Sequence, residues 1–174
     1  MPLDMTPTRP LASAPLGLLI VLVGALGAGT VFAQASRVAT EVVARGLQNP
    51  WALAFIGEGR MLVTERPGRM RVVGADGRLG APLGGLPAVD AGGQGGLLDV
   101  ITDRNFHRNR TLYFCFSEPA ATGSGNSTAL ASATLSSDST RLDDVKVIFS
   151  QTPKISSRSH FGCRIVQAGD GSLF

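Results

Sequence analysis

The chain has 174 residues, a length typical of one domain, and a formal net charge of +3 that is spread along the sequence. It has no run of basic residues and no basic patch with interleaved aromatic residues, which argues against a nucleic-acid-binding protein. With only two cysteines, it also lacks the disulfide framework of a small, cysteine-rich secreted protein.

The first 35 residues have the pattern of a secretory signal peptide. A head with one arginine, Arg9, precedes an uncharged apolar stretch, and the small-residue site AQA ends at Ala35. We therefore expect cleavage after Ala35 and export of residues 36–174 to the periplasm or the medium. The alternative is an uncleaved membrane anchor, because residues 16–32 lie at the short end of what spans a bilayer.

After the signal peptide, the sequence shows short β-type runs and almost no helical periodicity. Gly, Pro, Asp or Asn bounds each run, as is usual for turns between strands. The expected strands are residues 51–56, 60–65, 69–74, 96–102, 111–118, 128–135, 145–149 and 163–168. Within 111–118, Leu112, Phe114 and Phe116 fall on one face, which predicts a half-buried strand. We therefore expect an all-β protein built from hairpins.

Three of the expected strands share a local pattern. They contain LAF, LDV and RIV, at residues 53–55, 98–100 and 164–166. A side chain that can form hydrogen bonds stands four residues before each of them: Asn49, Gln94 and His160. Strand-rich repeats of about 40–50 residues are typical of β-propeller blades. The alternative is chance similarity among short strands.

If the repeats are blades, each aligned run is an innermost strand, and the polar residue before it projects towards one mouth of a central channel. Residues 36–174 have room for about three blades of about 40–50 residues. Closed propellers have about 4–8 blades. The sequence therefore predicts a partial β-propeller of about three blades, of which the last is incomplete.

Three segments in series resemble the soluble quinoprotein glucose/sorbosone dehydrogenase family, and within it the periplasmic aldose sugar dehydrogenases. The segments are NPWALAF…GRMLVTERPGRMRVV, GQGGLLDV…NRTLYFCFSE and HFGCRIV…DGSLF. The resemblance implies a six-bladed propeller that binds pyrroloquinoline quinone (PQQ), with calcium holding the cofactor. It also implies oxidation of small aldose sugars at the anomeric carbon to lactones, and it leaves the external electron acceptor open.

The resemblance assigns roles to two residues. His160, in HFG-x-R, corresponds to the general base, and Gln94, in GQGG, corresponds to a residue that contacts quinone and substrate. These residue types suit the chemistry, because a neutral imidazole can take the sugar hydroxyl proton while the quinone takes the hydride. An amide can donate to a quinone oxygen, and the glycines beside Gln94 would let a flat cofactor approach the backbone.

Arg164 is a further candidate for substrate binding. It cannot act as a base, so it either contacts the sugar in the channel or pairs with a carboxylate such as Asp99. His107, in a charged loop, is expected to face solvent. The aspartates are scattered and lack the spacing of a calcium loop, so no metal site is predicted here. The resemblance places the calcium ligands in later blades.

The two cysteines, Cys115 and Cys163, allow two interpretations. They either form a disulfide in the exported chain or are two small buried apolar residues.

The expected protein is an exported N-terminal portion of a PQQ-dependent sugar dehydrogenase, carrying the base His160 and inactive as this chain alone. The alternative is a non-enzymatic β-propeller module of the cell envelope that binds glycans or proteins. In that case His160 has a structural role.

Overall fold

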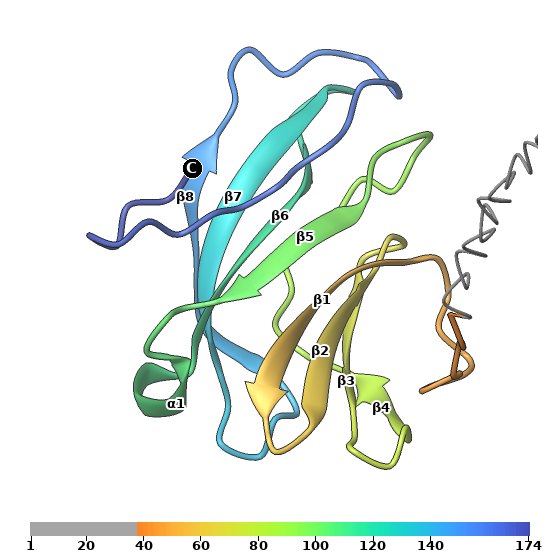
Figure 1. Cartoon of the computed structure of the whole chain (residues 1–174). Coiled ribbons are helices and arrows are strands. Elements are labelled where there is room, and N and C mark those ends of the chain that lie inside the picture. The colour runs from red at the N-terminus through yellow and green to blue at the C-terminus, as the bar shows by residue number, and fades with distance from the viewer. Residues whose placement is uncertain (1–37) are drawn as a thin grey trace, which may run out of the picture. The chain divides into compact units, whose positions relative to one another are not determined.

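The computed structural model describes residues 38–174, which contain eight β-strands and one short helix (Figure 1). The expected signal peptide, residues 1–35, lies outside the described residues. Residues Thr40–Phe174 form one compact unit. Within the described range, no helix has the length and apolarity needed to cross a membrane.

The first sheet is an antiparallel meander of four consecutive strands. They are β1 (Pro50–Gly57), β2 (Arg60–Glu65), β3 (Arg69–Val73) and β4 (Leu79–Pro82), paired in the order β1-β2-β3-β4. The β3–β4 turn needs a glycine at Gly77, where φ is 76° and an added Cβ would overlap the carbonyl oxygen of Val43. The turn therefore packs closely against the segment that precedes β1.

The second sheet repeats this arrangement. Its strands are β5 (Leu97–Thr102), β6 (Thr111–Pro119), β7 (Asn126–Leu135) and β8 (Leu142–Ser150), paired in the order β5-β6-β7-β8. The helix α1 (Phe106–Asn109) lies in the β5–β6 connection. All of the expected strands from 51–56 to 145–149 are present, so the prediction of an all-β protein is confirmed.

Two described elements were not expected from the sequence. The strand β4 has the sequence LGAP, which has little β-propensity, and it forms because Leu79 and Pro82 pair with β3. The helix α1 is a single turn, too short to show a helical period, and it ends at Arg110 in a left-handed conformation with φ 54°. Pairing with β3 therefore determines β4, and the local cap at Arg110 determines where α1 ends.

The main core lies between the two sheets. Buried residues of the first sheet, such as Leu62 and Met70, belong to the same cluster as Leu97, Phe114 and Phe116 of the second. Thr64 adds a polar link, because its hydroxyl donates to the carbonyl oxygen of Leu98 at 2.7 Å.

The last segment of the chain covers the opposite face of the second sheet. Cys115 and Leu98 are buried there under Phe161, Ile165 and Leu173, and Figure 1 shows this dark-blue segment crossing β7 and β6. The strand β6 is therefore buried on both faces rather than half-buried as expected.

The expected strand at 163–168 is only partly formed. The backbone groups of Val166 and Phe174 exchange hydrogen bonds of 2.8 and 2.9 Å, and Gln167 forms a bridge with Leu173. The paired stretch is too short for a continuous strand, so the prediction was right that residues 166 and 167 pair and wrong about the extent of the strand.

We expect Thr64→Val to lower the free energy of unfolding by about 2 kcal/mol, because the buried carbonyl of Leu98 and the N–H of Ala52 both lose their partner. Urea unfolding followed by fluorescence would measure the change. The matched control is Thr111→Val, because the half-buried Thr111 hydroxyl makes only a 3.5 Å contact with its neighbour Asn109. An equal effect of the two substitutions would contradict the proposed link between the sheets.

Candidate functional site

Gln94 and His160 lie together, although 66 residues separate them in the sequence. The backbone N–H of His160 donates to Oε1 of Gln94 at 2.6 Å, and the backbone N–H of Gln94 donates to the carbonyl oxygen of Arg158 at 2.9 Å. Both residues are exposed. The tertiary structure therefore brings together the two residues selected from the sequence, while their chemical roles stay predictions.

The backbone of His160 has a special conformation. Its φ is 65°, in the left-handed region where histidine and asparagine are more tolerated than most residues. Asn49, at the matching position of the first repeat, also has a positive φ, of 48°. This shared conformation supports the alignment of the first and third repeats.

Asn49 does not join the pair directly. Its carbonyl oxygen accepts a hydrogen bond of 3.0 Å from the N–H of Arg66. The structure gives it no hydrogen bond to Gln94 or His160 within the described residues. The candidate site therefore contains Gln94 and His160, which are two of the three aligned residues.

The loop that carries Gln94 packs closely against other parts of the chain, and its glycines make this close packing possible. An added Cβ at Gly93 would overlap the carbonyl oxygen of Arg158, and one at Gly96 would overlap that of Arg66. Both glycines also have a positive φ, of 57° and 147°. At these two positions glycine is therefore required by the close packing of the chain itself, and the expected approach of a cofactor to the glycines beside Gln94 stays a prediction.

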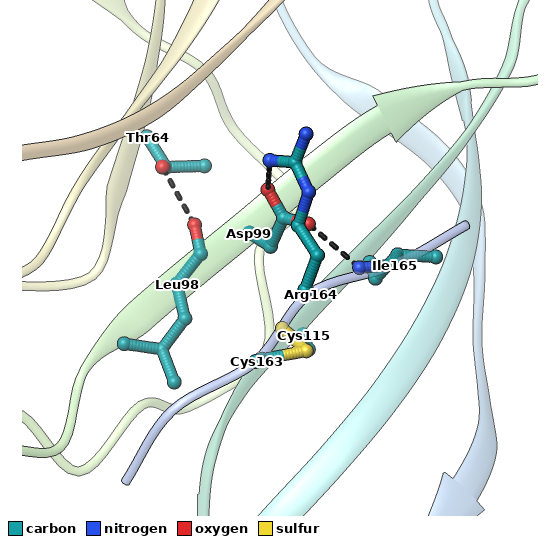
Figure 2. The surroundings of a disulfide bond; sticks show 7 residues. All are labelled: Thr64, Leu98, Asp99, Cys115, Cys163, Arg164 and Ile165. Carbon is teal, nitrogen blue, oxygen red and sulfur yellow. Dashed lines mark hydrogen bonds and ion pairs between the residues drawn. A yellow bond between two sulfur atoms is a disulfide. The ribbon is translucent and has the colours of Figure 1, made fainter. Parts of the chain in front are cut away.

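Arg164 pairs with Asp99, one of the two alternatives raised by the sequence. Its Nη1 lies 3.5 Å from Oδ1 of Asp99, whose Oδ2 accepts a hydrogen bond of 2.7 Å from the N–H of Ile165 (Figure 2). The Asp99 side chain is only 3% exposed, whereas that of Arg164 is 81% exposed. Asp99 therefore anchors the segment after His160, and substrate binding by Arg164 stays a prediction.

Cys115 and Cys163 form a disulfide with a Cα–Cα distance of 6.5 Å (Figure 2). The bond joins β6 to the position three residues after His160. Together with Asp99, it fixes the segment that carries His160 to the second sheet. Of the two interpretations left open by the sequence, the structure has the disulfide.

The carboxylate of Asp90 lies where the Gln94 loop begins. Nδ2 of Asn126 donates to it at 2.6 Å and the N–H of Gly92 at 2.9 Å. These two hydrogen bonds, together with the positive charge of Arg158, hold the pKa of Asp90 below its usual value and outweigh the opposing effect of burial.

This lowered pKa predicts a loss of stability in acid. A carboxyl group whose pKa is lower in the folded than in the unfolded state stabilises the fold at pH values above its unfolded pKa, which is near 4. This stabilisation is lost as the pH falls through the folded pKa. We expect Asp90→Asn to lower the free energy of unfolding by about 1 kcal/mol at pH 7. The free energy of unfolding of this variant should also fall less steeply below pH 4 than that of the unchanged protein. Thermal unfolding between pH 2 and 7 would measure both, and an unchanged acid profile would contradict the assignment.

Two cavities lie near these residues. One of about 610 Å³ is lined mainly by apolar residues, including Trp51 and Leu53, and also by Asp99 and Arg164. A smaller one, of about 190 Å³, includes His160. We place the candidate site at Gln94 and His160, because Asp99, the one carboxylate that the described residues contribute to the larger cavity, is already engaged.

Calcium has no cluster of charged ligands among the described side chains. Among residues 38–174, no group of three or more His, Cys, Asp or Glu side chains is arranged to hold a metal ion. No chemical step is therefore assigned to calcium. His107 is exposed on α1, which confirms its predicted contact with solvent.

A comparison with known proteins gives consistent matches. Residues 47–174 match the family model described as Glucose / Sorbosone dehydrogenase. The aldose sugar dehydrogenase YliI of Escherichia coli (strain K12) is 41% identical over 145 residues, which are 83% of this chain and 39% of that protein. This chain therefore spans about two fifths of the length of that relative.

Solved structures agree with the sequence matches. A crystal structure of a glucose dehydrogenase aligns with a TM-score of 0.72 and 42% identity, over 76% of this chain and 38% of the other. The PQQ-bound form of an aldose sugar dehydrogenase from Streptomyces coelicolor aligns with a TM-score of 0.64 and 28% identity, over 76% and 39%.

The two antiparallel sheets and these matches define an all-β chain of the sugar-dehydrogenase class. The chain belongs to the glucose/sorbosone dehydrogenase family.

Proposed function

We propose that this chain is part of an exported, PQQ-dependent dehydrogenase that oxidises aldose sugars at the anomeric carbon to lactones. The observation that carries the proposal is the contact between His160 and Gln94. Support comes from the family match and from relatives described as aldose sugar dehydrogenases, one of them in a PQQ-bound form. Export to the periplasm rests on the signal-peptide pattern of residues 1–35.

The proposed fold of the whole protein is a six-bladed β-propeller. The two four-stranded sheets would be two blades, since each is a meander of consecutive strands and they pack face to face around one core. The hairpin at 166–174 would begin a third blade, because it covers the free face of the second sheet.

Each residue of the pair has a separate task. His160 takes the proton of the anomeric hydroxyl on its imidazole, which is suited to this role near neutral pH. PQQ, when bound, supplies the acceptor for the hydride that leaves the same carbon. Gln94 uses Oε1 to hold the backbone of His160, which leaves its Nε2 group to donate to a quinone or sugar oxygen.

A chimera tests this function. Residues 47–174 would replace the matching part of the Escherichia coli relative, and reduction of a dye by aldoses would be measured with added PQQ and calcium. We expect PQQ-dependent activity from the chimera and none from the 174-residue chain alone. A folded chimera that binds an aldose without reducing the dye would contradict the proposal and favour a non-enzymatic binding module.

A further inference from the structure

The guanidinium group of Arg66 lies inside the curve of the Gln94 loop. Its Nη1 donates to three backbone carbonyl oxygens, those of Gly93 and Gly95 at 2.8 Å and that of Ala91 at 3.2 Å. These residues alternate along the loop, so the chain curls around a single cation. Two of the three, Gly93 and Gly95, are the immediate neighbours of Gln94.

Arg66 is itself held in place through its backbone. Its N–H donates to the carbonyl oxygen of Asn49, and its own carbonyl oxygen accepts from the N–H of Leu97, both at 3.0 Å. It thereby connects the entry to β1 with the start of β5. The guanidinium group therefore starts from a fixed backbone position in the turn between β2 and β3, while the carbonyl groups it binds lead into β5.

The loop has few other restraints on these carbonyl groups. Its amides have other partners: the N–H of Gly95 donates to the carbonyl oxygen of Gly92, that of Gly96 to the hydroxyl of Ser117, and that of Gln94 to the carbonyl oxygen of Arg158. For the carbonyl oxygens of Ala91, Gly93 and Gly95, the structure gives Arg66 as the donor. All three contacts come from Nη1, whose two N–H groups are shared among the three acceptors, and the ammonium group of a lysine would end one bond short of that position.

We propose that Arg66 is the positioning residue of this site: it holds the loop of residues 90–96 in the shape that presents Gln94 to His160. The positioning follows from the hydrogen bonds alone, whereas its consequence for catalysis rests on the proposed function. Arg66 acts through Gln94 and does not itself contact His160 by any hydrogen bond of the described residues.

The test uses the full chain with Arg66→Ala or Arg66→Lys. Arg71→Ala is the matched control, because Nε of Arg71 also donates to a backbone carbonyl, that of Gly80 at 2.8 Å, outside the loop. Hydrogen exchange of the Gln94 amide should become at least tenfold faster in both Arg66 variants and stay unchanged in the control. Amides of β7 should keep their protection in all three.

A second measurement tests whether Arg66 acts through Gln94. The chain has two histidines, so NMR of the imidazole groups gives one signal for His160 and one for His107, which serves as an internal reference. Arg66→Ala and Gln94→Ala should each shift the His160 signal, and the double variant should shift it no further than Gln94→Ala alone.

Unchanged exchange of the Gln94 amide in Arg66→Ala, or independent and additive shifts of the His160 signal, would overturn the proposal. Loss of β7 protection in both Arg66 variants would also overturn it, because Arg66 would then support the whole fold rather than this loop. None of these measurements needs PQQ. A folded chimera that binds an aldose without reducing the dye would therefore refute the proposed function and leave the positioning role intact.

Discussion

Reduction of the Cys115–Cys163 disulfide is expected to lower the free energy of unfolding by about 4 kcal/mol. The bond closes a loop with a sequence separation of 48 residues, and the loss of chain entropy in the unfolded state grows with loop length. Urea unfolding with and without dithiothreitol would measure the shift. Because native proteins are stable by only about 5–15 kcal/mol, this one bond accounts for a large share of the total.

The control for this prediction is the double variant Cys115→Ala, Cys163→Ala. It should be about as unstable as the reduced protein and should not respond to dithiothreitol. Reduction should also increase the mobility of His160, which lies three residues from Cys163. A midpoint that does not move on reduction would show that packing of Ile165 and the contact with Asp99 hold this segment without the disulfide.

In the active chimera, His160→Ala is expected to slow aldose oxidation by about 10²–10⁴-fold, the usual contribution of a general base. The loss should appear mainly in kcat, because the imidazole acts on the proton that moves in the transition state. Steady-state dye reduction at several aldose concentrations would separate kcat from KM.

His107→Ala is the matched control for this experiment. It removes the other histidine of the chain, which is exposed on α1, and should leave the rate unchanged. The two roles of His160 can also be separated, because the hydrogen bond to Gln94 comes from its backbone, which alanine keeps. A chimera with His160→Ala that retains full activity would refute the assignment of the base.

Much of the fold could be read from local patterns. The segment TLYFCFSE became β6 because its alternation and β-branched or aromatic residues suit a strand, whatever its neighbours are. Its burial on both faces was not predictable, because Tyr113 and Cys115 are covered by residues 161–173, which are far away in sequence. The strand β4 was missed for a similar reason, since its pairing with β3 outweighs a weak propensity.

The candidate site also has features that follow from local sequence and features that depend on distant contacts. Gln94 and His160 were selected because their residue types and surrounding motifs resemble those of a known family. Arg66 carries no such signal, because nothing in the motif TERPG shows which carbonyl groups its guanidinium group will bind. A lone arginine beside a turn carries no local signal for contacts made more than twenty residues away.

The sequence by itself determined the all-β class, the positions of most strands, and the two residues expected to carry the chemistry. These features depend on side-chain alternation, turn residues and short motifs, which are local properties of the chain. Only the tertiary structure decided that Cys115 pairs with Cys163, that Arg164 pairs with Asp99, and that Arg66 holds the Gln94 loop. Each of these contacts joins segments whose distance in space is set by how the sheets pack, and packing is a property of the whole chain.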